Sequence, residues 1–157
     1  KEKKKESDRE DCSPNLIEKA ELQHGIPKGL LLSVAMVESG CSPYSVNTSR
    51  RSIKFDSKEN AVSFISGEIQ RGNQNMSIGC MQLHYKTHGR NFVSVAEMLD
   101  SKKNALYAAR LLRSLRDRYG TWEKAVKAYH SGRARAGAAY YRKVMRRYGG
   151  DKTVLAS

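Results

Sequence analysis

The sequence places one carboxylate where it could work as an acid. Glu38 ends an almost wholly apolar run that extends over residues 30–37. Such surroundings disfavour the charged form of a carboxyl group and raise its pKa, which is one way in which proteins make a general acid. The alternative is an ordinary solvated glutamate at a helix end, and the pattern at this position leaves both interpretations open.

Two histidines have a spacing that is found among metal ligands. His84 and His88 stand four residues apart and would share one face of a helix. The residues between them do not include the glutamate of a zinc-protease helix, and Gly89 follows directly. We therefore interpret both as ordinary loop or surface histidines and predict no metal site.

Three short motifs follow one another along the chain: Glu38-Ser39-Gly40, Gly79-Cys80-Met81-Gln82 and Ala128-Tyr129-His130-Ser131-Gly132. In this order and spacing they resemble the soluble lytic transglycosylases of bacteria, relatives of the lysozyme fold that cleave the glycan strands of peptidoglycan. The resemblance covers about residues 12–148 and looks most like the periplasmic branch found in alphaproteobacteria. It implies an all-α fold, a compact lysozyme-like helical domain with little or no sheet.

The resemblance also implies roles for the matching residues. The catalytic glutamate of the family falls on Glu38. Substrate contacts are expected from Ser39, Gly79, Met81, Gln82, Tyr129, His130 and Tyr140. The last of these is the tyrosine that family members place near the acid, and the adjacent Tyr141 leaves a slip of one residue open.

One departure from related lysozyme-like proteins bears on the mechanism. Ser77 stands two residues before the motif glycine, where those proteins often carry a second catalytic carboxylate. Glycosidases that use two carboxyl groups need them about 5 to 9.5 Å apart. Asp56 and Glu59 are other candidates, but acids at a helix start are more often structural. The sequence therefore favours a mechanism with a single acid.

For such an enzyme the resemblance implies non-hydrolytic cleavage of the β-1,4 bond between N-acetylmuramic acid and N-acetylglucosamine. Glu38 would protonate the glycosidic oxygen and then, as a carboxylate, accept the proton of the muramoyl C6 hydroxyl. The product is a 1,6-anhydromuramoyl end, and no metal or organic cofactor is required. A hydrolase of the lysozyme type is the alternative among enzymes.

Three cysteines are too few for a disulfide scaffold, although two of them could form one bridge in an oxidising compartment. Members of the branch that the chain resembles carry cysteines matching Cys12 and Cys80. The resemblance therefore implies a Cys12–Cys80 bridge with Cys41 free, and a Cys41–Cys80 bridge is the alternative. It also implies a periplasmic protein, and because the chain shows no apolar signal segment we expect that one has been removed.

Helices are expected to position these residues. Apolar residues recur at helical spacing in six segments, over about residues 14–24, 27–40, 58–71, 102–119, 121–129 and 138–148. The segment that ends near Glu38 is apolar on nearly every side, so we expect it to be the buried central helix. Residues 41–56 lack a sustained period and predict a surface loop, with a short extended piece near residues 51–55.

The length of 157 residues fits one domain. We expect a disordered charged tail over residues 1–11, a lytic transglycosylase catalytic domain over residues 12–150 and a C-terminal tail over residues 151–157. No run approaches the roughly 20 apolar residues that a membrane-spanning helix needs.

The charge of the chain indicates the chemistry of its partners. The formal net charge is +13, so a partner attracted over a distance should be anionic. Peptidoglycan glycan strands satisfy this, and a cell-envelope assembly such as a flagellum or secretion system is a further candidate partner. A basic helical module that binds nucleic acid is the alternative outside enzymes, but the chain has no zinc-ligand spacing and no RNA-binding aromatic motif, so we expect no nucleic acid.

Overall fold

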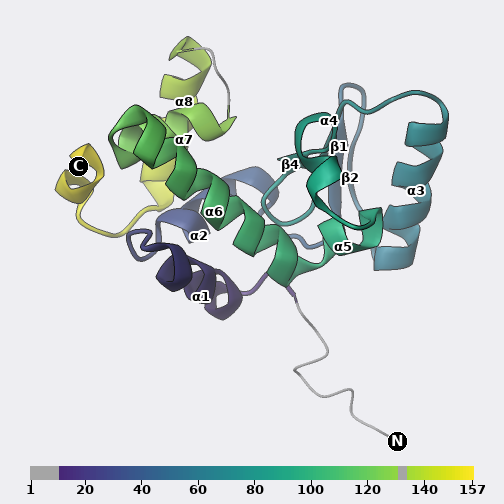
Figure 1. Ribbon diagram of the computed structural model, residues 1–157, viewed down its shortest axis with the longest axis horizontal. Coiled ribbons are helices and arrows are strands. Elements are labelled where there is room, and N and C mark those ends of the chain that lie inside the picture. Colours follow the sequence, from purple (N-terminus) through teal and green to yellow (C-terminus); the bar gives the residue numbers. More distant parts are fainter. Residues whose placement is uncertain (1–10, 131–133) are drawn as a thin grey trace, which may run out of the picture.

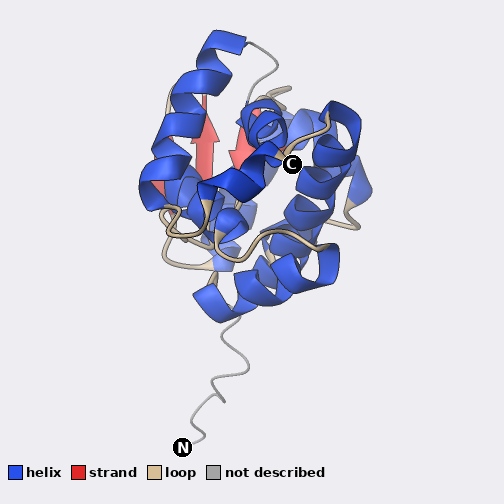
Figure 2. Cartoon of the chain, turned by 90° about the vertical axis from the view of Figure 1, so that its left-hand side faces the viewer, coloured by secondary structure: helices blue, strands red, loops and turns tan. Residues whose placement is uncertain are grey.

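A computed structural model describes residues 11–130 and 134–157 of the chain. Within these residues the protein is mostly helical, with eight α-helices and one small sheet of four strands. Figure 2 shows the strands as a minor part of a helical molecule. The predicted all-α class, with little or no sheet, is confirmed. The sheet consists of short strands of two to four residues.

The elements have the following bounds. The helices are α1 (Pro14–His24), α2 (Leu30–Ser39), α3 (Lys58–Gln70), α4 (Tyr85–His88), α5 (Val95–Leu99), α6 (Ser101–Tyr119), α7 (Trp122–His130) and α8 (Ala134–Arg147), with 3-10 helices η2 (Gly89–Asn91) and η3 (Lys152–Ala156). The strands are β1 (Ser45–Thr48), β2 (Ser52–Lys54), β3 (Met76–Ile78) and β4 (Leu83–His84).

Helix α6 runs through the middle of the molecule (Figure 1). In this view the sheet and helices α3, α4 and α5 lie to the right of it, and α1, α2, α7 and α8 lie around its left-hand part. Helix α6 packs against α1 and α7, while α2 packs against α8. The buried face of α6 consists mainly of small residues and leucine, namely Ala105, Ala108, Ala109 and Leu112, which lets neighbouring helices approach closely.

Helix α2 is buried on most of its surface, as predicted, but it begins at Leu30 rather than at Pro27. The buried carboxylate of Glu21 accepts hydrogen bonds from the backbone N–H groups of Gly29 (3.0 Å), Leu31 (2.8 Å) and Leu32 (3.2 Å). These donors have no partner inside the helix, so a carboxylate satisfies them and also opposes the positive end of the helix dipole. A side chain of α1 thereby fixes where α2 begins.

Two other helices differ slightly from the predicted bounds. Helix α6 begins at Ser101, one residue before the predicted range, and Asp100 caps it, since its carboxylate accepts from the N–H of Lys103 at 3.0 Å. Helix α8 begins at Ala134, earlier than expected. Serine side chains cap two other helices: Ser13 caps α1 and Ser57 caps α3.

The sheet is antiparallel with strand order β2-β1-β3-β4. Strands β1 and β2 form a hairpin within the segment predicted to be a surface loop, and β2 coincides with the short extended piece predicted near residues 51–55. Val46 pairs with Ile78, and Ile78 pairs with Leu83, and all three side chains are buried. This apolar face fixes the register of strands that are too short to be stable alone.

The two ends of the chain were both predicted to be tails. Residues 1–10 lie outside the described part of the structure. At the other end, residues 152–156 form η3, which packs against α7 with the side chain of Leu155 fully buried. No helix in the described parts of the chain combines the length and the apolar composition that crossing a membrane requires.

Candidate active site

A cleft of about 350 Å³ lies between the helices and the small sheet. Helices α2, α6 and α7 contribute the lining residues Glu38, Leu111, Tyr129 and His130. The opposite wall comes from the sheet, the turn before β4, and α4. Its lining residues are Asn47, Ser77, Gln82, Leu83, His84 and His88.

Glu38 enters this cleft from the last turn of α2. Its Oε2 accepts a hydrogen bond of 2.9 Å from the hydroxyl group of Tyr140. Burial raises the pKa of the carboxyl group to about 7, against the opposite effect of the tyrosine hydrogen bond. At neutral pH, Glu38 therefore divides its time between a form that can give a proton and a form that can take one.

Tyr140 lies on α8 and is almost completely buried. Burial and the neighbouring Glu38 raise the pKa of its hydroxyl group, which therefore stays protonated and remains a donor. Its ring stacks on His130, with 4.3 Å between ring centroids and 8° between planes. Burial and the positive charge of Lys143 lower the pKa of His130, which favours the neutral imidazole in the cleft.

The turn between β3 and β4 begins at Gly79, where the structure has no room for a side chain. Gly79 has φ +83°, and a Cβ atom built on it would lie 2.6 Å from Nδ2 of Asn104. The fully buried Asn104 accepts a hydrogen bond from the N–H of Met81 at 2.8 Å. It donates to the carbonyl oxygens of Ile78 (3.1 Å) and Met98 (2.8 Å). Helix α6 thus holds the turn through one side chain.

Gln82 ends this turn in a left-handed conformation, with φ 54°, which is uncommon for a residue with a side chain. Its Nε2 donates to the carbonyl oxygens of Ser45 (3.1 Å) and Gly79 (2.9 Å), and its Oε1 accepts from Nδ2 of Asn47 at 2.6 Å. Strain of this kind is maintained only where several contacts enforce it, and it is frequent at functional sites. The amide is therefore fixed in one orientation at the cleft.

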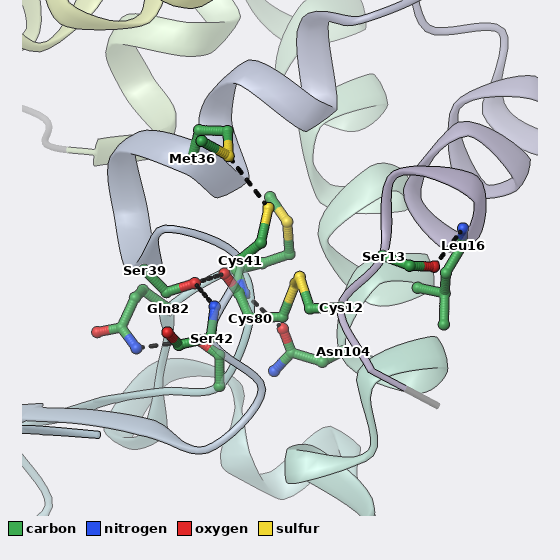
Figure 3. Close-up of a disulfide and its surroundings, with 12 residues drawn as sticks. Cys12, Ser13, Leu16, Met36, Ser39, Cys41, Ser42, Cys80, Gln82 and Asn104 are labelled. Carbon is green, nitrogen blue, oxygen red and sulfur yellow. Dashed lines mark hydrogen bonds between the residues drawn. A yellow bond between two sulfur atoms is a disulfide. The ribbon is translucent and has the colours of Figure 1, made fainter. Parts of the chain in front are cut away.

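Two residues predicted to contact substrate, Ser39 and Met81, do not line the cleft but hold the turn that does. The hydroxyl group of Ser39 donates to the carbonyl oxygen of Cys80 at 2.7 Å and accepts from the N–H of Ser42 at 3.0 Å (Figure 3). The side chain of Met81 is fully buried, and its carbonyl oxygen accepts from the hydroxyl group of Tyr129 at 2.7 Å. Ser39 thus connects α2 to the turn that carries Gln82, and the carbonyl oxygen of Met81 connects the same turn to α7.

The predicted site residues therefore fall into two groups. Gln82, Tyr129 and His130 line the cleft with Glu38, and Tyr140 reaches it through the hydrogen bond to Glu38. Ser39, Gly79 and Met81 are not among the residues that line it. Tyr140, not Tyr141, is the tyrosine beside the acid. Ser131 and Gly132 of the third motif lie outside the described residues.

Cys12 and Cys80 form a disulfide, the pairing that the family resemblance implied, and Cys41 is free. The bridge ties the residues before α1 to the turn that carries Gln82. The Sγ of Cys41 lies 3.4 Å from the Sδ of Met36, so the thiol packs against α2 beside the bridge (Figure 3).

Some cleft residues were not predicted from the sequence. His84 and His88 were interpreted as ordinary loop or surface residues, yet they lie in β4 and α4 and both line the cleft. The Nδ1 of His88 lies 2.8 Å from the hydroxyl group of Tyr107. Asn47 and Leu111 carried no sequence signal, because an isolated polar or apolar residue becomes informative only through its three-dimensional neighbours. In the described parts of the chain, no group of three or more His, Cys, Asp or Glu residues could hold a metal ion.

The carboxylates of the cleft are few. Among the described residues that line it, Glu38 is the only acid. Ser77, at the position where related proteins often have a second carboxylate, does line the cleft. Asp56 and Glu59, the other sequence candidates, are exposed and are not among the lining residues.

Comparison with known families agrees with the motifs and the geometry. The chain matches the family described as Transglycosylase SLT domain over residues 15–152, a range that contains all residues of the cleft. Searches among curated proteins and among solved structures gave no match. Because the match covers most of the chain, it confirms the family resemblance seen in the motifs. The chain belongs to the transglycosylase SLT domain family and is a lytic transglycosylase that cleaves peptidoglycan.

Proposed function

We propose that Glu38 is the single acid and base of this enzyme. As the protonated acid it gives its proton to the oxygen of the β-1,4 bond between N-acetylmuramic acid and N-acetylglucosamine. As the resulting carboxylate it takes the proton of the muramoyl C6 hydroxyl, whose oxygen closes onto C1. The bond from C1 to the leaving sugar breaks, no water is consumed, and the new end is 1,6-anhydromuramic acid.

The observation that carries this proposal is the hydrogen bond between Tyr140 and Glu38 in the cleft, together with a pKa of about 7 for the glutamate. A pKa near the working pH allows one group both to give and to take a proton efficiently. The tyrosine donates to one carboxylate oxygen only, Oε2. This leaves Oε1 as the atom that we assign to proton transfer with the substrate.

Attack by the internal hydroxyl is supported by what faces Glu38. Ser77 lines the cleft without a negative charge, and the other described residues of the lining include no second carboxylate. Water in this cleft would therefore lack a carboxylate partner to activate it, whereas the C6 hydroxyl is already attached to the reacting sugar. Such tethering gives effective molarities of about 10⁵ M or more in well-oriented cases.

The remaining predicted site residues receive two kinds of role in the proposal. Gln82, Tyr129 and His130 contact the sugars directly, because they line the cleft. Ser39, Gly79 and Met81 position the backbone of the turn through the contacts described above. The carbonyl oxygen of Met81 is already engaged by Tyr129, so we do not assign it to the substrate.

Mass spectrometry of the fragments released from purified peptidoglycan tests the proposal. The expected fragments end in 1,6-anhydromuramic acid and weigh one water less than lysozyme products. Chitin oligomers, which lack muramic acid, should not be cleaved. Reducing muramic acid as the dominant end would refute the mechanism and favour the hydrolase, and a Glu38→Gln preparation controls for contaminating enzymes.

We further propose that the protein works in the periplasm. The substrate is found outside the cytoplasm, and a disulfide is typical of an oxidising compartment. A cell-envelope assembly that must pass through the wall, such as a flagellum or secretion system, is the partner class that this activity would serve. Fractionation of the source cells and affinity purification from the envelope fraction test the two statements separately.

A further inference from the structure

A second hollow of about 510 Å³ lies between the turn that joins β1 to β2 and the C-terminal end of α3, and it concentrates positive charge. We call it the arginine pocket; it is lined by Thr48, Ser49, Arg50, Arg51, Glu68, Arg71 and Asn73. Three guanidinium groups face one carboxylate, so the lining has a formal charge of +2 from these four side chains. Nothing in the proposed reaction uses this pocket.

The arginine pocket and the cleft lie on opposite faces of the sheet and come close to each other at the end of β1. Asn47 and Thr48 are neighbours on β1, so their side chains leave the strand on opposite faces, and the first lines the cleft while the second lines the arginine pocket. Thr48 pairs with Met76 on β3, next to Ser77, which also lines the cleft. A peptide carried by a strand that lies in the cleft therefore reaches the arginine pocket by passing round the turn between β1 and β2.

The backbone that carries two of the arginines is held in place by hydrogen bonds. The hydroxyl oxygen of Thr48 accepts from the N–H groups of Arg50 (3.2 Å) and Arg51 (3.0 Å), which fixes the turn between β1 and β2. The guanidinium group of Arg51 lies 5.5 Å from the ring centroid of Phe64, a distance at which the ring attracts a cation. Phe64 is itself packed against Phe55.

The single carboxylate of the pocket is already occupied. Glu68 pairs with Arg71 at 3.1 Å and accepts a second hydrogen bond from Asn73 at 3.0 Å. These contacts, with a contribution from the charge of Arg51, lower its pKa, so it remains ionised. Among the described residues, neither Arg50 nor Arg51 forms an ion pair with a carboxylate of the chain. Two guanidinium groups are thus available to a ligand.

We propose that the arginine pocket binds the carboxylate-bearing peptide attached to a muramic acid residue of the strand being cleaved. This inference rests on the proposed function, because it assumes that the strand lies in the cleft beside Glu38. Paired guanidinium groups match the geometry of carboxylates and bind them through charge-assisted hydrogen bonds. The pocket would anchor the strand one or more sugars away from the reacting bond and make peptide-bearing strands the preferred substrate.

The test compares two soluble substrates: glycan strands that carry their peptides, and the same strands after an amidase has removed the peptides. The Arg50→Gln/Arg51→Gln variant should raise KM on peptide-bearing strands by about tenfold and leave kcat unchanged. On stripped strands it should behave as wild type. The matched control is Arg118→Gln/Lys124→Gln, which removes the same charge from exposed residues outside the cleft and the arginine pocket.

Three kinetic results would overturn the inference: no rise in KM, an equal rise on both substrates, or an equal rise in the control variant. The last two would mean that the arginines act only through the general positive charge. Inorganic phosphate, added at constant ionic strength, tests whether the arginine pocket is an unspecific anion site. If it is, phosphate will abolish the preference for peptide-bearing strands, which would overturn the inference. A preference that persists in phosphate supports it.

A binding measurement separates this inference from the proposed function. Glu38→Gln protein, with and without the Arg50→Gln/Arg51→Gln pair, is titrated with peptide-bearing strands. Weaker binding by the protein that lacks the arginines supports the pocket, and equal binding refutes it. Both results can be obtained even if wild-type protein forms no anhydromuramoyl ends, which would refute the mechanism instead.

Discussion

The Glu38–Tyr140 pair combines two opposing effects on one carboxyl group. Burial disfavours the carboxylate and raises its pKa, while the hydroxyl group of Tyr140 stabilises it. The balance is a pKa of about 7. Tyr140 can sustain this role because burial and the charge of Glu38 raise its own pKa and keep its proton in place.

Replacement of Glu38 by Gln should abolish activity and preserve the fold. Gln has nearly the same size but can neither donate the proton to the glycosidic oxygen nor accept one from the C6 hydroxyl. General acid–base catalysis typically contributes about 10² to 10⁴ in rate, so kcat should fall by at least about 100-fold. Circular dichroism checks the helices, and release of soluble fragments from cell wall gives the rate. Activity above about a tenth of wild type would show that Glu38 is not the acid.

Tyr140→Phe should shift the pH–rate profile to higher pH. Removal of the hydroxyl group deletes a hydrogen bond that favours the carboxylate, so the pKa of Glu38 rises further. The fraction of protonated acid then persists at higher pH, while kcat falls because the carboxylate is less well oriented. Tyr141→Phe, one residue along α8, is the matched control. The same shift in both variants would argue against a direct role of the Tyr140 hydroxyl.

At the residue scale, the positions of Glu38 and Tyr140 came from the family resemblance. The two residues lie far apart in the chain and meet through the packing of α2 against α8, where Tyr140 donates a hydrogen bond to Glu38. Asn47 was missed because its importance depends on the hydrogen bond to Gln82 across the sheet. The two histidines were assigned to the surface because their spacing was tested only for metal binding.

At the scale of elements, one buried amide connects the sheet to the helices. Asn104 on α6 makes three hydrogen bonds to backbone groups of β3, of the turn before β4 and of α5. All three bonds are buried, so water cannot replace Asn104 without a rearrangement. The position of Gln82 in the cleft therefore depends on a residue that does not line it.

Asn104→Ala should destabilise the protein and impair catalysis together. An unsatisfied buried polar group costs about 1 to 3 kcal/mol, and three are created, so the free energy of unfolding should fall by about 3 kcal/mol or more. Urea unfolding measures this loss. Activity per folded molecule should also fall because the turn that fixes Gln82 is released. An exposed asparagine, Asn60, provides the control substitution Asn60→Ala. Full activity per folded molecule would show that Asn104 is only a core residue.

The six longer helices were predictable because their periodicity and caps are local signals, whereas the short helices α4 and α5 were not predicted. Ser13, Ser57 and the glycines after α1 and α6 mark helix ends within a few residues of sequence. The sheet was not predictable, since its pairing of Val46 with Ile78 joins distant segments and each strand has at most four residues. The late start of α2 depends on Glu21, a tertiary contact from α1.

At the scale of the whole molecule, the disulfide closes a long loop. Cys12 and Cys80 are separated by 68 positions, and the bridge joins the start of the domain to the turn at the cleft. By the loop-entropy model such a closure stabilises the folded state by about 4 kcal/mol, chiefly by restricting the unfolded chain.

The Cys12→Ser/Cys80→Ser variant should therefore lose about 4 kcal/mol in free energy of unfolding, measured by chemical denaturation under non-reducing conditions. Cys41→Ser is the control and should unfold close to wild type under the same conditions, because Cys41 is free. Non-reducing peptide mapping of the wild-type protein should recover Cys12 joined to Cys80. Recovery of a Cys41–Cys80 peptide instead would contradict the pairing.

The catalytic proposal also predicts how stability depends on pH. The folded-state pKa of Glu38, about 7, lies above the value of 4.5 for an ordinary glutamate, so between these values the folded chain retains a proton that the unfolded chain has released. The stability associated with the protonated form is complete below pH 4.5 and is lost as pH rises toward 7 and above, by about 3 kcal/mol at most.

Glu38→Gln should remove this loss. The variant should unfold at a higher urea concentration than wild type at pH 8, and the two proteins should be nearly equal at about pH 4.5. Burial lowers the pKa values of His88 and His130, which acts in the opposite direction, but both proteins contain these histidines. The difference between the two stability curves therefore isolates Glu38. Parallel curves from pH 4.5 to pH 8 would mean that Glu38 titrates as an ordinary surface glutamate, and the assignment of this residue as the resting acid would fail with them.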